Sequence, residues 1–175
     1  MTINEFDHLD DDKKSELLTQ CCGSSNWVKK MVASPWAEDL VDLEVIAEES
    51  WWACTPDDWK EAFEHHPKIG DRNSLKKKFA NTAGWAANEQ AGVNTAADEV
   101  IVALAKGNEE YEKKFGFIFI VCATGKSAEE MLQILQSRLP NNIDEELEVA
   151  AEEQLKITKI RLAKLFGVEQ GPEQM

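Results

Sequence analysis

Apolar residues recur along most of this chain three and four positions apart, which is the spacing of one face of an α-helix. Turn-forming residues interrupt the pattern, such as Gly23 after one apolar run and Pro140 after another. The pattern predicts helices over 10–22, around 27–31, and over 43–54, 56–64, 74–80 and 85–91. A long helix follows, which starts within 94–98 and extends to 115 with a break or bend near Gly107. Further helices are predicted over 127–139 and 144–166. We therefore expect an all-α fold: a single compact domain over 1–175 with about eight helices and a frayed tail over 168–175.

Two of the predicted helices begin with clear capping signals. Thr55 precedes Pro56, and the acids that follow suit the positive end of the helix dipole. Ser127 is followed three positions later by Glu130, which is the pattern of a capping box. These signals predict where both helices start.

One segment does not follow the helical period. Residues 115–122 are mainly β-branched and aromatic, and they contain Gly116 and precede Gly125. Because no second strand-like run is present to pair with them, we expect a short irregular or extended buried segment near 116–122. Its backbone N–H and C=O groups need other partners, and a ligand is one candidate.

Composition and charge narrow the classes of function. Hydrophobic residues make up 43% of the 175 residues, which is enough for a packed core. No apolar run reaches the ~18 residues that a membrane-spanning helix needs, and the first residues lack the pattern of a signal peptide. We therefore expect a cytoplasmic protein with no membrane partner. The net charge of −14 disfavours nucleic acid as a partner, because such binding needs many Lys and Arg contacts to phosphate.

The four cysteines show no metal-binding pattern. None forms a CxxC motif, and no histidine lies at zinc-finger spacing from them. We interpret Cys21, Cys22, Cys54 and Cys122 as reduced and mostly buried thiols.

His66 is the first candidate for chemistry. The helix predicted over 56–64 leads into it, and Pro67 ends that helix and disfavours the α conformation for His66. Imidazole is the side chain best suited to proton transfer near neutral pH. The alternative is a histidine that caps its own helix, while the neighbouring His65 pairs with Glu61. Adjacent histidines without an HxxxH or ExxH pattern do not favour a helical metal site, and we expect no metal.

Glu89 and Arg161 are polar residues in apolar surroundings. Glu89 shares a helical face with Trp85, so it is either a rim residue or a carboxylate that needs a partner. Arg161 is one of only three arginines and lies between Ile157 and Leu165 at helical spacing. Its guanidinium suits planar recognition of a carboxylate or a ureido group, and a structural pair with a glutamate is an equally good interpretation.

Together these stretches resemble a known enzyme family. Four motifs follow one another along the chain: His66-Pro67-Lys68-Ile69-Gly70-Asp71, Trp85 to Gln90, Phe115 to Ile120, and Lys156 to Leu162. The similarity around them covers almost the whole chain. This order is similar to that of the 2-oxo-4-hydroxy-4-carboxy-5-ureidoimidazoline (OHCU) decarboxylases, which are carboxy-lyases that complete the conversion of urate to allantoin. The resemblance implies an all-helical homodimer that acts on the small molecule OHCU without a cofactor.

The resemblance also implies roles for individual residues. His66 matches the catalytic proton donor, and Glu89 and Arg161 match the acid and the arginine of the catalytic site. The substrate-binding positions match Pro67, Ala86, Gln90, Phe117, Ile118, Phe119, Ile120 and Val121. Many members have serine in place of Ala86 and proline in place of Ile118, so this chain lacks one hydroxyl contact and gains one N–H.

The implied reaction needs no organic cofactor, because the ring C=N of the substrate accepts the electron pair that loss of CO₂ leaves behind. His66 would supply or relay the proton that the product carbon then takes up. Glu89 would bind hydroxyl or ureido N–H groups, and Arg161 would position substrate oxygens. The competing hypothesis is a non-catalytic helical module that binds a purine-breakdown product or a protein partner, and the hydroxyl missing at Ala86 is its only support.

Overall fold

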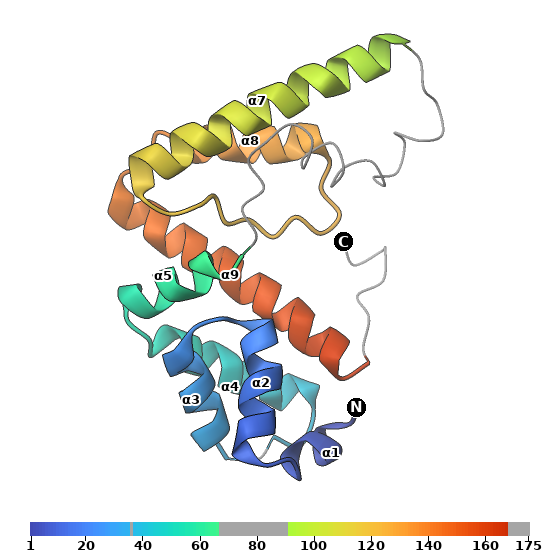
Figure 1. Ribbon diagram of the computed structural model, residues 1–175, viewed down its shortest axis with the longest axis vertical. Coiled ribbons are helices and arrows are strands. Elements are labelled where there is room, and N and C mark those ends of the chain that lie inside the picture. Colours follow the sequence, from blue (N-terminus) through green and yellow to red (C-terminus); the bar gives the residue numbers. More distant parts are fainter. Residues whose placement is uncertain (36, 67–90, 168–175) are drawn as a thin grey trace. The chain divides into compact units, whose positions relative to one another are not determined.

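The fold is given by a computed structural model that describes residues 1–35, 37–66 and 91–167, with side chains described from residue 98 onward in the last range (Figure 1). Every regular element in these ranges is an α-helix, which confirms the predicted all-α class. The helices are α1 (Ile3–Asp7), α2 (Asp11–Cys21), α3 (Ser25–Ala33), α4 (Leu40–Trp52), α5 (Pro56–Glu64), α7 (Ala91–Phe115), α8 (Ala128–Arg138) and α9 (Ile143–Leu165). The helices predicted over 74–80 and 85–91 and the tail over 168–175 lie largely or wholly outside the described residues.

The described chain separates into two compact units. The first contains Met1–His66, the short stretch Ile120–Cys122 and the chain from Leu147 onward, so it includes α1 to α5 and most of α9. The second includes α7, α8 and the first turn of α9 up to Glu146. The two units are described separately below.

In the first unit, α3 packs against α2, α4 and α5. Two fully buried tryptophans tie these helices together. The indole N–H of Trp27 donates to the carbonyl of Ala47 on α4 at 3.1 Å, and that of Trp51 on α4 donates to the carbonyl of Ala151 on α9 at 2.9 Å. A buried tryptophan needs such a partner for its single donor, so these bonds fix how α4 packs against α3 and α9.

The capping signals place helix starts correctly. The Thr55 side chain accepts from the Asp58 N–H in a capping box at the start of α5, and Ser127 caps α8 by accepting from the Glu130 N–H. The five-residue helix α1 was not predicted. It is capped by Thr2, and it is too short to show an apolar period.

In the second unit, α7 packs against α8 and runs through Gly107 as one helix. Of the break or bend predicted there, the break is therefore wrong. A Cβ atom at Gly107 would lie 2.5 Å from Cδ2 of Leu135, which is fully buried on α8. Glycine at this position therefore serves close packing of two helices. The cost of glycine within a helix is offset by this contact.

Residues 116–127 join α7 to α8 as an irregular segment, which confirms the predicted element near 116–122. Gly116 ends α7 with a φ of +81°, a value that suits glycine. Phe117, Ile120 and Cys122 are buried, and Ile118, Phe119 and Val121 are half-buried.

The four cysteines form no disulfide and are buried, as predicted: Cys21, Cys22, Cys54 and Cys122. Over the ranges that the structure describes, the helices lack the combination of length and apolar character needed to cross a membrane.

Candidate functional site

His66 follows α5 and its ring reaches across to α9. Its main-chain N–H donates to the carbonyl of Phe63 at 3.2 Å, which completes the turn at the helix end. Its side chain is half-buried, and Nε2 lies 2.5 Å from Oε1 of Gln154. The residue at the helix C-cap is His65, so the imidazole of His66 is directed to another element of the first unit.

Gln154 is itself held by a second buried polar residue. Its Nε2 donates to Oγ1 of Thr158 at 3.2 Å, and the Thr158 hydroxyl donates to the main-chain carbonyl of Gln154 at 2.9 Å. Thr158 also lies within hydrogen-bonding reach of Cys22. Burial raises the pKa of Cys22 to about 12, so this thiol stays protonated near neutral pH.

Arg161 is one turn beyond Thr158 on α9. Its Nη1 donates to the carbonyl of Cys21, the last residue of α2, at 3.4 Å, where the negative end of the helix dipole favours a cation. Burial raises the pKa of Cys21 to about 11, and the nearby guanidinium opposes this rise. Within the described ranges no carboxylate forms an ion pair with Arg161, so the structural pair with a glutamate is not found there.

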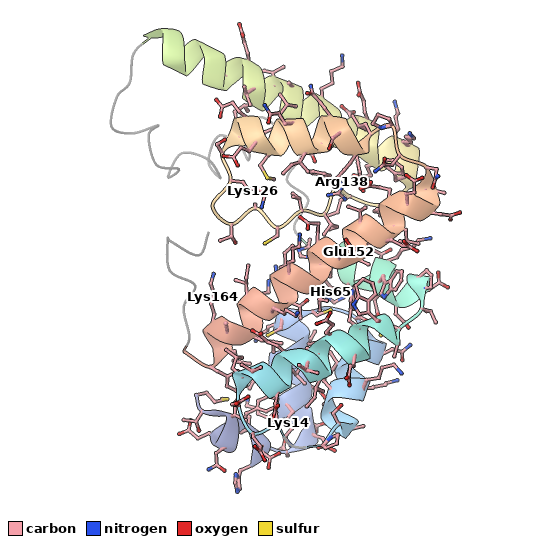
Figure 2. All side chains as sticks on the ribbon, turned by 180° about the vertical axis from the view of Figure 1, so that it is seen from behind. Lys14, His65, Lys126, Arg138, Glu152 and Lys164 are labelled. Atoms are coloured by element: carbon pink, nitrogen blue, oxygen red, sulfur yellow. The ribbon has the colours of Figure 1, made fainter. Side chains whose placement is uncertain are left out.

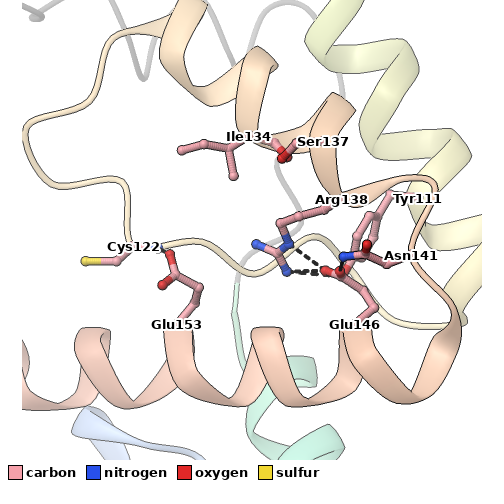
Figure 3. Close-up of polar contacts among 8 residues, drawn as sticks. All are labelled: Tyr111, Cys122, Ile134, Ser137, Arg138, Asn141, Glu146 and Glu153. Atoms are coloured by element: carbon pink, nitrogen blue, oxygen red, sulfur yellow. Dashed lines mark hydrogen bonds and ion pairs between the residues drawn. The ribbon is translucent and has the colours of Figure 1, made fainter.

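The end of the irregular segment is anchored to α9 in the same unit. Oε1 of Glu153 accepts from the main-chain N–H of Cys122 at 3.1 Å (Figure 3), and Oε2 of Glu153 lies 2.5 Å from Nζ of Lys156. This hydrogen bond to Glu153 is the main cause of a raised pKa at Lys156. Glu153 thus provides one of the partners that the backbone of this segment was expected to need. Ile120 and Val121 directly precede Cys122 and lie in this unit.

The start of the same segment belongs to the second unit, where it packs on aromatic and cationic side chains. The ring of Phe117 lies 5.9 Å from that of Tyr111 between centroids. The ring of Phe119 lies 5.2 Å from Tyr111 and has the guanidinium of Arg138 over its face at 4.7 Å. Ile118 lies between them in the sequence and is half-buried.

Arg138 is fixed by a buried carboxylate in the second unit (Figure 3). Glu146 has no exposed surface and accepts from the Tyr111 hydroxyl at 2.5 Å, from Arg138 Nε at 2.6 Å and from Asn141 Nδ2 at 3.1 Å. A second contact joins Nη2 of Arg138 to the same carboxylate. Burial, together with the hydrogen bond to Glu146, raises the pKa of Tyr111 well above its ordinary value. This network fixes Arg138 and Tyr111, the two side chains that pack against the ring of Phe119.

One predicted pair is wrong. Glu61 does not pair with His65: its carboxylate accepts from the main-chain N–H of Ser25 at 2.8 Å and from the Ser25 hydroxyl at 2.7 Å, at the start of α3. His65 (labelled in Figure 2) instead lies against Gly23, where an added Cβ would be 2.3 Å from its Cγ. Ser24 caps α3 by accepting from the Trp27 N–H, and Glu61 adds an acceptor for the first N–H of the helix at Ser25. These two donors of Ser25 outweigh the weak exposed pair with His65.

The predicted site residues fall into three groups. His66, Arg161, Ile120 and Val121 lie in the first unit. Phe117, Ile118 and Phe119 lie in the second. Pro67, Ala86, Glu89 and Gln90 lie outside the described residues.

Gln154 and Thr158 were not predicted. The signal that could have found them is a pair of polar residues, four positions apart, on the apolar face of α9 that carries Ala151, Leu155 and Leu162.

An imidazole and a guanidinium held along one long helix of an all-α fold define a helical protein with a candidate proton-transfer site. The family model for OHCU decarboxylase matches residues 7–163, and the chain belongs to this family. This confirms the resemblance seen in the sequence motifs.

Individual relatives agree with this assignment. The chain is 41% identical over 152 residues to the uric acid degradation bifunctional protein TTL of Arabidopsis thaliana, covering 84% of this chain and 45% of that protein. It is 31% identical over 112 residues to the 2-oxo-4-hydroxy-4-carboxy-5-ureidoimidazoline decarboxylase of Xenopus laevis, covering 63% of this chain and 62% of that protein. The matches therefore span about half to three-fifths of these two relatives.

The fold also matches a solved structure. A crystal structure of OHCU decarboxylase in the presence of (S)-allantoin superposes with a TM-score of 0.68 at 37% identity, covering 90% of this chain and 99% of that one.

Proposed function

We propose that this protein is a carboxy-lyase that converts OHCU to (S)-allantoin in the breakdown of urate. Membership of the OHCU decarboxylase family supports this activity. The structural observation that carries the proposal is the placement of His66 and Arg161 along one face of α9 within the first unit.

The face is defined by helix geometry. Gln154, Thr158 and Arg161 are spaced four and three residues apart, which places them on the same side of α9. His66 meets the first of them, and Arg161 lies seven residues further on, roughly 10 Å along the helix axis. Two side chains of this length can bind one small molecule between them.

His66 is the proton donor in this proposal. Breakage of the bond to the carboxyl carbon releases CO₂ and leaves an electron pair, which the adjacent ring C=N takes up. The product carbon then forms its new C–H bond with a proton from the imidazolium of His66, which becomes neutral imidazole. Delivery from one side gives a single enantiomer. Because the substrate ring is the electron sink, the step needs no metal or organic cofactor.

Arg161 binds the ureido carbonyl or a ring oxygen of the substrate. A strong contact with the departing carboxylate would stabilise the ground state and slow its loss. The protein carries a net charge of −14 and the substrate is an anion, so local positive charge from Arg161 also offsets long-range repulsion. Glu89 accepts hydrogen bonds from hydroxyl or ureido N–H groups. Substrate contacts come from Pro67, Ala86, Gln90 and the segment 117–121.

The test is the rate of allantoin formation from freshly generated OHCU, compared with its spontaneous decay. Circular dichroism of the product reports whether the S enantiomer is formed. His66→Ala should lower the catalysed rate about 10²–10⁴-fold while the unfolding transition stays in place. His65→Ala is the matched control and should keep the activity, because this neighbour is exposed and is directed to Gly23. A wild-type protein that gives no acceleration would favour the non-catalytic binding module.

Three further properties belong to this proposal: a single OHCU decarboxylase-like domain over 1–175, a homodimer and a cytoplasmic location. The first is supported by the family match over 7–163. The other two rest on the resemblance and on the sequence composition.

A further inference from the structure

Gln154 is a buried amide that sits between the candidate proton donor and a second buried polar residue. It is 0% exposed and Thr158 is 2% exposed. An amide in such a place must have partners for both its oxygen and its nitrogen. Those partners are His66 on one side and Thr158 on the other.

The hydrogen bonds determine which way the amide faces. Thr158 has one hydroxyl proton, and it is donated to the main-chain carbonyl of Gln154 at 2.9 Å. The hydroxyl oxygen can then only accept, so the NH₂ group of Gln154 must point toward Thr158. The carbonyl oxygen of the amide therefore faces His66.

The direction of the amide in turn determines the state of the imidazole. A carbonyl oxygen has no proton to give, so Nε2 of His66 must carry hydrogen and donate it across the 2.5 Å contact. This holds for the neutral ring and for the imidazolium, since both can have a hydrogen on Nε2. The proton that distinguishes these two states is then on Nδ1.

We propose that Gln154, oriented by Thr158, is a positioning residue that holds His66 in the Nε2–H tautomer and makes Nδ1 the atom through which it gives its proton. The inference rests on the proposed function. In the step described above, the Nδ1–H bond of the imidazolium breaks as the new C–H bond of the product forms, and neutral Nε2–H imidazole remains. A solvent proton on Nδ1 then restores the donor.

The choice of an amide has a chemical consequence. A carboxylate in the place of Gln154 would also accept from Nε2, but its negative charge would stabilise the imidazolium and weaken it as an acid. A neutral amide fixes the ring and the tautomer without adding charge.

The first test is Gln154→Leu, which keeps the bulk of the side chain and removes the acceptor. We expect kcat to fall about 10–100-fold with KM nearly unchanged, as for other residues that orient a catalytic group. Gln154→Glu should keep the acceptor and move the pH dependence of kcat to higher pH. Thr158→Val should reproduce part of the loss, and Thr158→Ser, which restores the hydroxyl, should rescue it.

The second test observes the tautomer directly and does not require activity. The chain has only three histidines, so ¹⁵N NMR of histidine-labelled protein gives a simple spectrum, in which His66→Ala identifies the signals of His66. In the neutral wild-type ring, Nε2 should show the shift of a protonated nitrogen and Nδ1 that of an unprotonated one. In Gln154→Leu the two shifts should move toward a mixture of tautomers.

A matched control separates positioning from general destabilisation. Leu43→Ala removes a buried side chain from α4 and should lower stability without moving the pH profile or the ¹⁵N shifts. If Gln154→Leu keeps the wild-type kcat and the wild-type tautomer, the positioning role is wrong. If the wild-type protein shows the Nε2–H tautomer but does not accelerate loss of CO₂, the proposed function fails while the structural part of this inference stands.

Discussion

Replacing Glu146 by glutamine tests whether the buried ion pair of the second unit stabilises its fold. Glu146 has no exposed surface and accepts hydrogen bonds from Tyr111, Arg138 and Asn141. Glutamine has nearly the same shape, so Glu146→Gln removes the charge without opening a cavity. Arg138, which is 5% exposed, then loses this carboxylate while it stays buried.

The expected loss follows from the burial of both partners. Removing one member of a buried ion pair costs about 3–5 kcal/mol, because the other charge stays out of water without its partner. The whole free energy of unfolding of a domain is about 5–15 kcal/mol, so the effect should be large. The triple change Tyr111→Phe, Arg138→Met and Glu146→Leu should recover part of the stability, since it removes the carboxylate together with the Tyr111 hydroxyl and the Arg138 guanidinium, two of its three donors.

Urea unfolding, analysed by linear extrapolation, measures the change. Glu148→Gln is the matched control: Glu148 is exposed on the same helix, and its substitution should change the free energy of unfolding by less than about 0.5 kcal/mol. If Glu146→Gln unfolds within about 1 kcal/mol of the wild-type protein, the ion pair is not the stabilising feature that its burial indicates.

Two further predictions concern the first unit. Arg161→Lys keeps the positive charge but loses the planar fork of the guanidinium, so kcat/KM for OHCU should fall about tenfold or more; a wild-type value would contradict recognition by a guanidinium. Burial raises the pKa of Cys21 to about 11 and of Cys22 to about 12 from 9.0, so thiols in the unfolded chain ionise first. The two protonated thiols therefore contribute fully to the free energy of unfolding below pH 9, and this contribution is lost as the pH rises through 11 to 12. Urea unfolding at a series of pH values measures this loss, which Cys22→Ala should reduce.

Local signals in the sequence were sufficient where one residue decides the structure. Thr55 and Ser127 fix the starts of α5 and α8, because each side chain accepts from an N–H three positions later. Gly116 ends α7 for an equally local reason. These features need no knowledge of the rest of the fold.

Features that depend on a distant partner could not be predicted in this way. Glycine often marks a break in a helix, but the role of Gly107 is determined by Cδ2 of Leu135 on α8, which packs against it. Glu61 has the spacing to pair with His65, but the start of α3 at Ser25 provides stronger donors. In both cases the partner lies more than twenty positions away, and only packing brings it near.

The same reasoning explains why the sequence pointed to His66 and Arg161 as candidates but not to Gln154. His66 and Arg161 stand out because imidazole and guanidinium are rare in this chain, whereas Gln154 contacts His66 across 88 positions and resembles any other polar residue of a helix. Its importance comes from α9, whose fixed rise sets the distances among Gln154, Thr158 and Arg161. A single rigid helix that places Gln154, the partner of His66, and Arg161 on one face can hold a small-molecule site in productive geometry. Such geometry is the main requirement of the proposed reaction, in which the substrate itself provides the electron sink.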